Sequence, residues 1–128
     1  MMVSGRAVYD DGTLRITCTG SPPVVALHGD LDEASRPGLV RAVEEAADGH
    51  SEVHFDFAGV DYCDLAGLRA IISVTGTGRD GTARLRRVVL HQMAPELSRV
   101  LRILGWDSTP GLTLDRSTGP SPRTMEAL

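Results

Sequence analysis

The chain contains no lysine, because all thirteen of its basic residues are arginine. This absence excludes chemistries that need an ammonium group, such as a phosphate-loop lysine, a Schiff base or a lysine general base. Arginine is permanently charged and cannot shuttle protons, so every cationic contact here is a fixed one. Aromatic residues are also scarce, at five among 128 residues. The core must therefore be mostly aliphatic.

Long apolar runs and a strong positive charge are also missing. The longest uninterrupted apolar stretch, residues 24–27, is far shorter than the roughly 20 residues that a membrane helix needs. Residues 1–6 lack the apolar segment of a secretory signal. The formal charge of −4 disfavours a nucleic-acid binder. These features predict a cytoplasmic protein without direct membrane insertion and without a nucleic-acid partner.

The residues that usually carry catalysis or bind metals are few and scattered. Cys18 and Cys63 lie in apolar contexts, and we expect both to be buried, reduced thiols. His50 and His54 are four residues apart, but they straddle a loop-to-strand boundary instead of sharing a helix face. No Ser or Cys lies in a nucleophile elbow. We therefore expect no enzyme activity, no catalytic residue, no metal and no cofactor.

The length and the 41% apolar content predict one packed domain. Residues 6–18 read as a β-hairpin around the turn sequence Asp10-Asp11-Gly12. Residues 24–28 form a continuous apolar run, which predicts a strand that is buried on both faces and ended by Gly29.

Helices and strands then alternate. A helix is expected from the N-cap Ser35 to a C-cap at Asp48-Gly49, and another from Pro95 to a C-cap at Gly105. The middle helix is expected over residues 65–75, the remaining strands over 53–57, 85–90 and 112–114, and a loop over 58–63. The prediction is an α/β fold with a single mixed β-sheet and α-helices packed on it, in the order N-terminal β-hairpin then β-α-β-α-β-α. The domain is expected over residues 1–115, followed by a disordered C-terminal tail over 116–128.

Two motifs have ordinary structural interpretations. Residues 76–81 match G-x-G-x-x-G, but they follow a helix and precede a strand, the reverse of a dinucleotide-binding context. We interpret them as a connection. Arginines gather next to it, and we expect them to form a solvated edge that discourages strand pairing; they are Arg79, Arg84, Arg86 and Arg87.

The start of the middle helix is the candidate functional surface. Asp64 lies at the N-cap position, Leu65 can project outward from the first turn, and Gly67 permits close approach of another backbone. Acidic residues also precede the first helix, at Asp30, Asp32 and Glu33. We expect them to favour the helix N-terminus, although they could also bind a cation. Physical reasoning alone predicts a surface that meets a partner or a phosphate.

Three stretches in order resemble the STAS domain family of anti-sigma-factor antagonists. Residues 29–34 resemble G-E-L-D-x-x-x-A, and residues 56–68 resemble D-L-S-x-V-x-F-x-D-S-[SA]-G-L. Residues 100–107 resemble the end of a late helix, V-L-x-x-x-G-L-D. The resemblance covers roughly residues 5–115.

The resemblance implies regulation by partner switching. Such antagonists bind an anti-sigma factor that is also an ATP-dependent serine kinase, and phosphorylation of the first Ser in D-S-[SA]-G ends the binding. The partner implied is an anti-sigma factor of this type or another STAS-binding regulator. The implied partner-binding loop is Asp64, Leu65, Ala66, Gly67 and Leu68, with Asp30, Asp32, Tyr62 and Arg69 supporting it.

The phosphoacceptor itself is absent from the sequence. Leu65 occupies its position and Ala66 follows, so neither residue can accept a phosphoryl group. We therefore expect a non-enzymatic binding module that serine phosphorylation does not switch. The alternatives are a scaffold subunit of a larger signalling or lipid-transport complex, a small-ligand sensor, and a homodimer of the chain.

Overall fold

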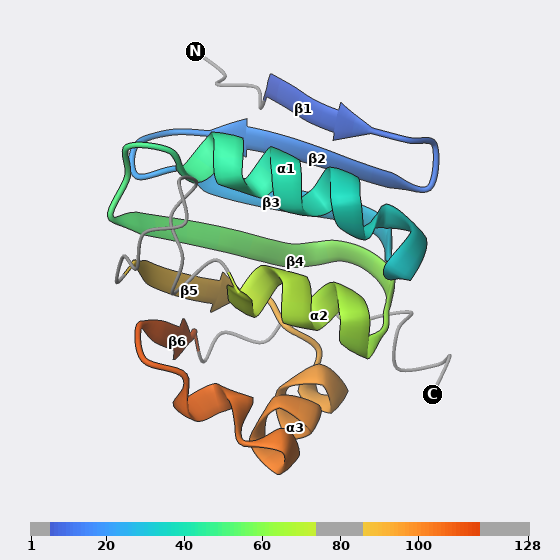
Figure 1. Ribbon diagram of the computed structural model, residues 1–128. Helices are drawn as coiled ribbons and strands as arrows, with labels where there is room; N and C mark the ends of the chain where they lie inside the picture. The colour runs from blue at the N-terminus through green and yellow to red at the C-terminus, as the bar shows by residue number, and fades with distance from the viewer. Residues whose placement is uncertain (1–5, 74–85, 116–128) are drawn as a thin grey trace.

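The computed structural model describes residues 6–73 and 86–115, which form one mixed β-sheet with helices packed against it (Figure 1). The six strands lie in the sheet in the order in which they occur in the chain. The first three pair antiparallel, and β3 to β6 run parallel to one another. The strands are β1 (Arg6–Asp10), β2 (Leu14–Thr19), β3 (Val24–Leu31), β4 (Glu52–Cys63), β5 (Arg87–His91) and β6 (Leu112–Leu114).

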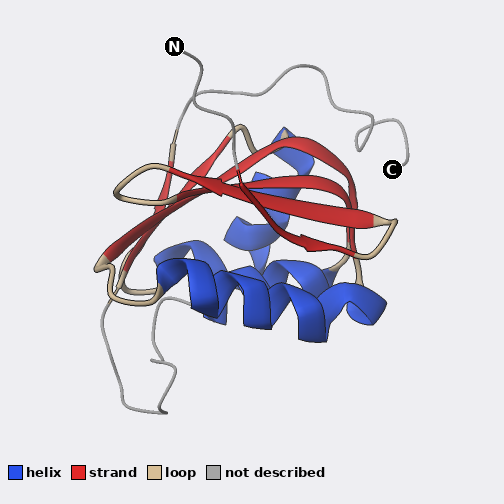
Figure 2. Cartoon of the chain, turned by 90° about the horizontal axis from the view of Figure 1, so that it is seen from above, coloured by secondary structure: helices blue, strands red, loops and turns tan. Residues whose placement is uncertain are grey.

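Helices connect the parallel strands. A short 3₁₀ turn, η1 (Glu33–Ser35), leads into α1 (Arg36–Ala47) between β3 and β4. The helix α2 (Leu65–Ile72) follows β4 directly, and α3 (Pro95–Leu104) with η3 (Trp106–Ser108) joins β5 to β6. Figure 2 shows α1 and α2 side by side on one face of the sheet.

This one-sided arrangement explains the burial of the strands. Side chains alternate between the two faces of a strand, and in β4 buried and half-buried residues alternate from Glu52 to Phe57. The side chains between the sheet and the helices are almost fully buried; the largest are Phe55, Leu14, Ile16, Leu27, Leu31, Leu39, Leu68, Ile71, Leu90 and Leu101. The core is thus aliphatic apart from a few rings, as the scarcity of aromatic residues predicts.

The predicted fold class is confirmed, and so is the order of its elements. The hairpin turn at residues 10–12 joins β1 and β2, and β6 coincides with the expected strand at 112–114. Gly105 ends α3 in the left-handed conformation, with φ +75°. Ser35 precedes α1 as expected, but its side chain makes no capping hydrogen bond. The glycine-rich segment 76–81 and the tail 116–128 lie outside the described residues.

Two expectations about the strand that contains Gly29 were wrong. The strand does not end at Gly29 but continues to Leu31. A Cβ at Gly29, where φ is +104°, would collide with the carbonyl oxygen of Thr13. The glycine therefore lets β2 approach closely and shifts the pairing register instead of ending the strand. The run is also not buried on both faces, because Val24 and His28 are exposed.

The expected loop at residues 58–63 is wrong as well. These residues continue β4 to Cys63, where Tyr62 pairs with Asp30 and Cys63 pairs with Leu31. A second register shift, between the Ala26 and His28 pairs, interrupts the alternation of apolar residues. That interruption made the extended strand look like a loop in the sequence.

The β1–β2 turn is organised by one carboxylate. Asp11 accepts hydrogen bonds from the backbone N–H groups of Thr13 and Leu14 at 2.9 and 2.7 Å, and from the Tyr9 hydroxyl at 2.8 Å. The backbone bonds to Leu14 and Thr13, followed by the bond from Tyr9, hold the pKa of Asp11 well below its usual range. The same bond from Tyr9 raises the pKa of the Tyr9 hydroxyl.

We predict that Asp11→Ala lowers the free energy of unfolding at pH 7 by about 1 kcal/mol, the usual effect of losing a side chain that caps backbone N–H groups. The folded-state pKa of Asp11 is depressed, so its stabilisation is complete above about pH 4, the ordinary Asp range. It is lost as the pH falls through the folded-state pKa. Urea unfolding between pH 2 and 7 tests this, and Asp10→Ala, which loses one bond to Gly12, is the control. A difference from wild type that persists unchanged at pH 2 would contradict the prediction.

Candidate partner-binding surface

The candidate surface begins where β4 passes into α2. Asp64 has extended backbone angles and accepts a hydrogen bond from the backbone N–H of Gly67 at 2.8 Å. The Asp64 N–H in turn donates to the Leu31 carbonyl at 3.0 Å. The predicted N-cap is thus confirmed, and it ties the start of α2 to the end of β3.

Gly67 is required by this packing. A Cβ at this position would lie 2.7 Å from the Leu31 carbonyl oxygen and 2.9 Å from its carbon. Two backbones therefore meet here without a side chain between them. Leu68, next along the helix, is buried in the core with 1% exposure. The close approach expected from the sequence is confirmed, and the structure identifies the second backbone as Leu31.

Leu65 lies on the outer side of this corner. It is 53% exposed, and Tyr62, three residues earlier, is 47% exposed. Arg69 is also exposed, one turn further along α2. The arrangement places apolar side chains in solvent at a helix start whose backbone is rigidly held.

The acidic residues of the first motif lie beside this corner, because β3 and β4 pair in parallel and end together. Asp30 pairs with Tyr62 across the sheet. Asp32 caps η1, accepting from the Ser35 backbone N–H at 3.0 Å and from its hydroxyl at 3.1 Å. Capping, the expected role of these acids, is therefore confirmed for Asp32.

Cys18 and Cys63 are not joined by a disulfide, and both are half-buried rather than fully buried. Cys63, at the end of β4, lies against the candidate surface. Burial, and secondarily the charge of Asp64, raises the pKa of the Cys63 thiol to about 12. The thiol is therefore neutral at physiological pH and is not a nucleophile there.

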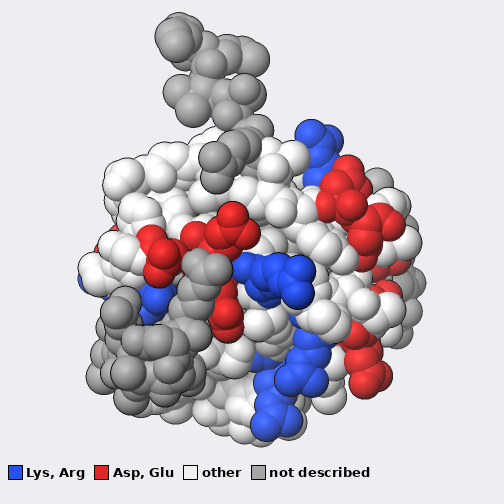
Figure 3. All heavy atoms as spheres, turned by 45° about the horizontal axis from the view of Figure 1, so that its top comes forward, with Lys and Arg blue, Asp and Glu red and all other residues white. Residues whose placement is uncertain are grey.

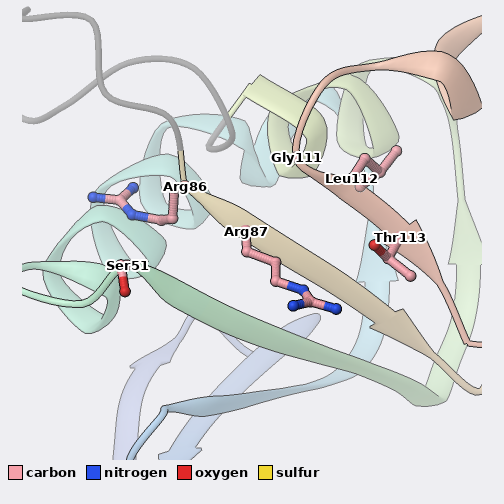
Figure 4. Close-up of a pocket in the computed structure, with 6 residues that line it drawn as sticks. All are labelled: Ser51, Arg86, Arg87, Gly111, Leu112 and Thr113. Atoms are coloured by element: carbon pink, nitrogen blue, oxygen red, sulfur yellow. The ribbon is translucent and has the colours of Figure 1, made fainter.

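Arg86 departs from the solvated edge expected of the arginine cluster. Arg86 is 5% exposed and its Nε donates to the His50 carbonyl at 3.1 Å, whereas Arg87 is exposed. Figure 4 shows these two side chains in a hollow of about 400 Å³, with their guanidinium groups directed apart. They therefore do not converge on one anion. Arg79 and Arg84 lie outside the described residues.

The described residues give little support for a metal site, a membrane-spanning helix or a basic surface. Within residues 6–73 and 86–115, no three His, Cys, Asp or Glu side chains are arranged to hold a metal ion. No helix in that part of the chain is long and apolar enough to cross a membrane. Figure 3 shows arginine and acidic side chains interspersed over the visible face, without an extended basic patch.

Comparison with known proteins identifies the family. The family model described as "Mlab, STAS domain" matches residues 14–114. The chain belongs to the STAS domain family. No curated protein matches the sequence of this STAS domain.

Solved structures share its fold. The unphosphorylated anti-sigma factor antagonist SpoIIAA superposes with a TM-score of 0.59 at 16% identity, covering 83% of this chain and 90% of that one. An anti-sigma factor antagonist from Mycobacterium paratuberculosis gives a TM-score of 0.56 at 19% identity, covering 86% of this chain and 84% of the other. At these identities the likeness establishes the SpoIIAA-like fold of the STAS domain.

We predict that Gly67→Ala destabilises the STAS domain by about 1–3 kcal/mol, the usual range for overpacking, because the new Cβ meets backbone and not a movable side chain. Arg69→Ala, on the exposed side of the same helix, should stay within about 0.5 kcal/mol of wild type. Chemical denaturation at pH 7 measures both. Equal stabilities for Gly67→Ala and Arg69→Ala would show that the corner tolerates a side chain.

Proposed function

We propose that this STAS domain is a non-enzymatic protein-binding module of the anti-sigma-factor-antagonist type that serine phosphorylation does not switch off. The single observation that carries the proposal is Leu65, a half-exposed apolar side chain at the position of the phosphoacceptor. The partner we propose is an anti-sigma factor of the serine-kinase ATPase type or another regulator that binds STAS domains. The binding surface is the corner formed by residues 64–68, supported by Asp30, Asp32, Tyr62 and Arg69.

The chemistry of the corner supports the loss of the switch. A phosphorylated serine adds a charge of about −1.5 to −2, which breaks an apolar contact because the dianion would have to be desolvated. Leu65 and Ala66 have no oxygen that could receive a phosphoryl group. The hydroxyl of Ser73 is at the far end of α2 and donates to the Ala70 carbonyl at 2.7 Å. A substitute acceptor on the described part of α2 is therefore poorly placed.

Apolar surface supports binding at the same place. Fully burying a leucine side chain contributes about 1.5–3 kcal/mol relative to leaving it exposed. Leu65 is half exposed in the free chain, so only part of this is available to a partner, and Tyr62 adds a ring beside it. An aromatic ring and an aliphatic side chain on a preorganised helix start are typical of the anchors of protein interfaces.

A second candidate function is a scaffold subunit in a larger signalling or lipid-transport assembly. The same Leu65 favours it, because a surface without a switch suits a permanent contact. Light scattering on the purified chain and capture of partners from the native lysate separate the two. A large homo-assembly, or capture of other STAS chains or transport proteins alone, would favour the scaffold over the antagonist.

We predict that Leu65→Asp weakens binding to the captured partner by more than tenfold, which corresponds to about 1.4 kcal/mol, because a carboxylate replaces apolar contact. Isothermal titration calorimetry with the purified partner measures this. The matched control is Ile103→Asp, which changes an exposed apolar residue on α3, 73% exposed. Unchanged affinity for Leu65→Asp, or an equal loss for Ile103→Asp, would place the interface elsewhere.

A second prediction concerns the switch. With a serine-kinase anti-sigma factor and labelled ATP, the wild-type chain should take up no phosphate on this corner, whereas Leu65→Ser should become labelled at residue 65. Leu65→Ala is the control, because it removes the leucine without supplying a hydroxyl. Phosphopeptide mass spectrometry locates the label. Phosphorylation of wild type by the kinase would overturn the unswitched character of the module.

A further inference from the structure

Four titratable side chains form a continuous row of contacts on the face of the sheet opposite α1 and α2. Nε2 of His54 lies 2.6 Å from Oε2 of Glu52, on the same strand. Nδ1 of His54 lies 2.7 Å from Nε2 of His91, on β5. Nδ1 of His91 lies 2.6 Å from Oδ2 of Asp115, directly after β6. These four side chains thus span three parallel strands, and Glu52 and His54 lie at the opposite end of β4 from the β4–α2 corner.

The two imidazole rings meet edge to edge. Their planes differ by 15° and their centroids lie 4.9 Å apart. A nitrogen–nitrogen distance of 2.7 Å is compatible with that centroid separation only if the facing nitrogens lie between the two centroids. The lone pair of an imidazole nitrogen lies in the ring plane, so these two nitrogens point at each other. This is the geometry of an N–H···N hydrogen bond.

Counting protons shows which protonation state the three contacts require. Three hydrogen bonds need three protons, shared among two imidazoles and two carboxylates. Two neutral imidazoles carry only two protons, and if both are donated to Glu52 and Asp115, two lone pairs face each other. Two imidazolium rings carry four protons, and two N–H groups then face each other. With two protons, one of the three contacts lacks a proton, so all three are hydrogen bonds at the same time only in the state with three protons.

Among the described residues, few charged side chains lie next to these four. Arg87 is the cross-strand partner of Glu52, and Asp56 is the cross-strand partner of His91. On the other side, β3 presents Val24 opposite His54 and Ala26 opposite Asp56. His28 lies further along β3, opposite Gly59. All four members of the chain are partly shielded, with side-chain exposures of 21–35%.

We propose that this Glu52–His54–His91–Asp115 chain is a pH-sensitive fastener that holds β6 to the sheet while it contains three protons. The strand β6 has only three residues, and the Asp115 N–H donates to the Leu90 carbonyl at 2.9 Å beside the fastener. The anchoring of this short strand thus depends on the protonation of the histidine pair. The inference does not rest on the proposed partner.

The direction of the pH dependence follows from linkage. In the unfolded chain, separate histidines titrate near pH 6.5. Well above that pH, the two histidines of the unfolded polypeptide hold two protons in total, whereas the folded pair holds three. The free energy of unfolding therefore falls as the pH rises. Well below it they hold four, so stability falls as pH decreases. The contribution of the fastener should therefore be greatest near pH 6.5, with the unfolding equilibrium changing by up to tenfold per pH unit on either side.

The test is urea unfolding of the full chain from pH 5 to 8.5, for wild type, His91→Gln and His28→Gln. His28 is an exposed histidine on the same sheet and is the matched control. The stability of wild type relative to His91→Gln should show a maximum near pH 6.5, while His28→Gln keeps the wild-type profile. A pH-independent difference between wild type and His91→Gln would overturn the proposal.

Ring ¹⁵N spectra of wild type provide a test that needs no variant to fold. At pH 6.5 the two rings should share three N–H protons, with one proton between His54 Nδ1 and His91 Nε2. Two neutral rings without a shared proton would overturn the fastener. A metal ion between the rings would also overturn it, and it would show as ring signals that change on adding EDTA to the purified chain and return with Zn²⁺.

Discussion

The parallel pairing of β3 with β4 is the interaction on which the rest of the structure depends. It brings the ends of both strands to one edge, so the Leu31 carbonyl reaches the first turn of α2. That contact leaves no space for a side chain at Gly67 and fixes the direction in which Leu65 projects. The candidate surface is thus a product of backbone packing, and its side chains are presented by a frame that cannot easily relax.

Much of this frame was predictable because its signals are local. Asp64 and Gly105 act within one turn of their helices, and the Asp10-Asp11-Gly12 turn needs only its own residues. The position of Leu65 was predictable for the same reason, since the first turn of a helix exposes one side to solvent. The order of the elements was predictable as well, because turn and cap signals separate the apolar runs, and the motifs of the STAS family agree with that order.

The remaining features depend on residues that are distant in sequence. Gly29 was interpreted as a strand end because the approach of the Thr13 carbonyl, its reason for being glycine, cannot be read from neighbouring residues. Arg86 was assigned to a solvated edge because its bond to the His50 carbonyl joins residues 36 positions apart. The histidine pair was missed for the same reason: His54 and His91 are 37 residues apart and meet only through strand pairing. An alternation of polar residues on β4, open to one face, was the only sequence signal.

Leu65 has a consequence for how such a module would be controlled in a cell. If serine phosphorylation does not inactivate this surface, as proposed above, its binding would be regulated through the amounts of the two proteins. Half of the partner is occupied when the concentration of free module equals the dissociation constant. Each tenfold increase in that concentration changes the free energy of the bound state relative to the unbound state by about 1.4 kcal/mol. Synthesis, degradation and competition among binders would then set the output. Under the proposed function, leucine at position 65 would replace control by phosphorylation with control by protein concentration.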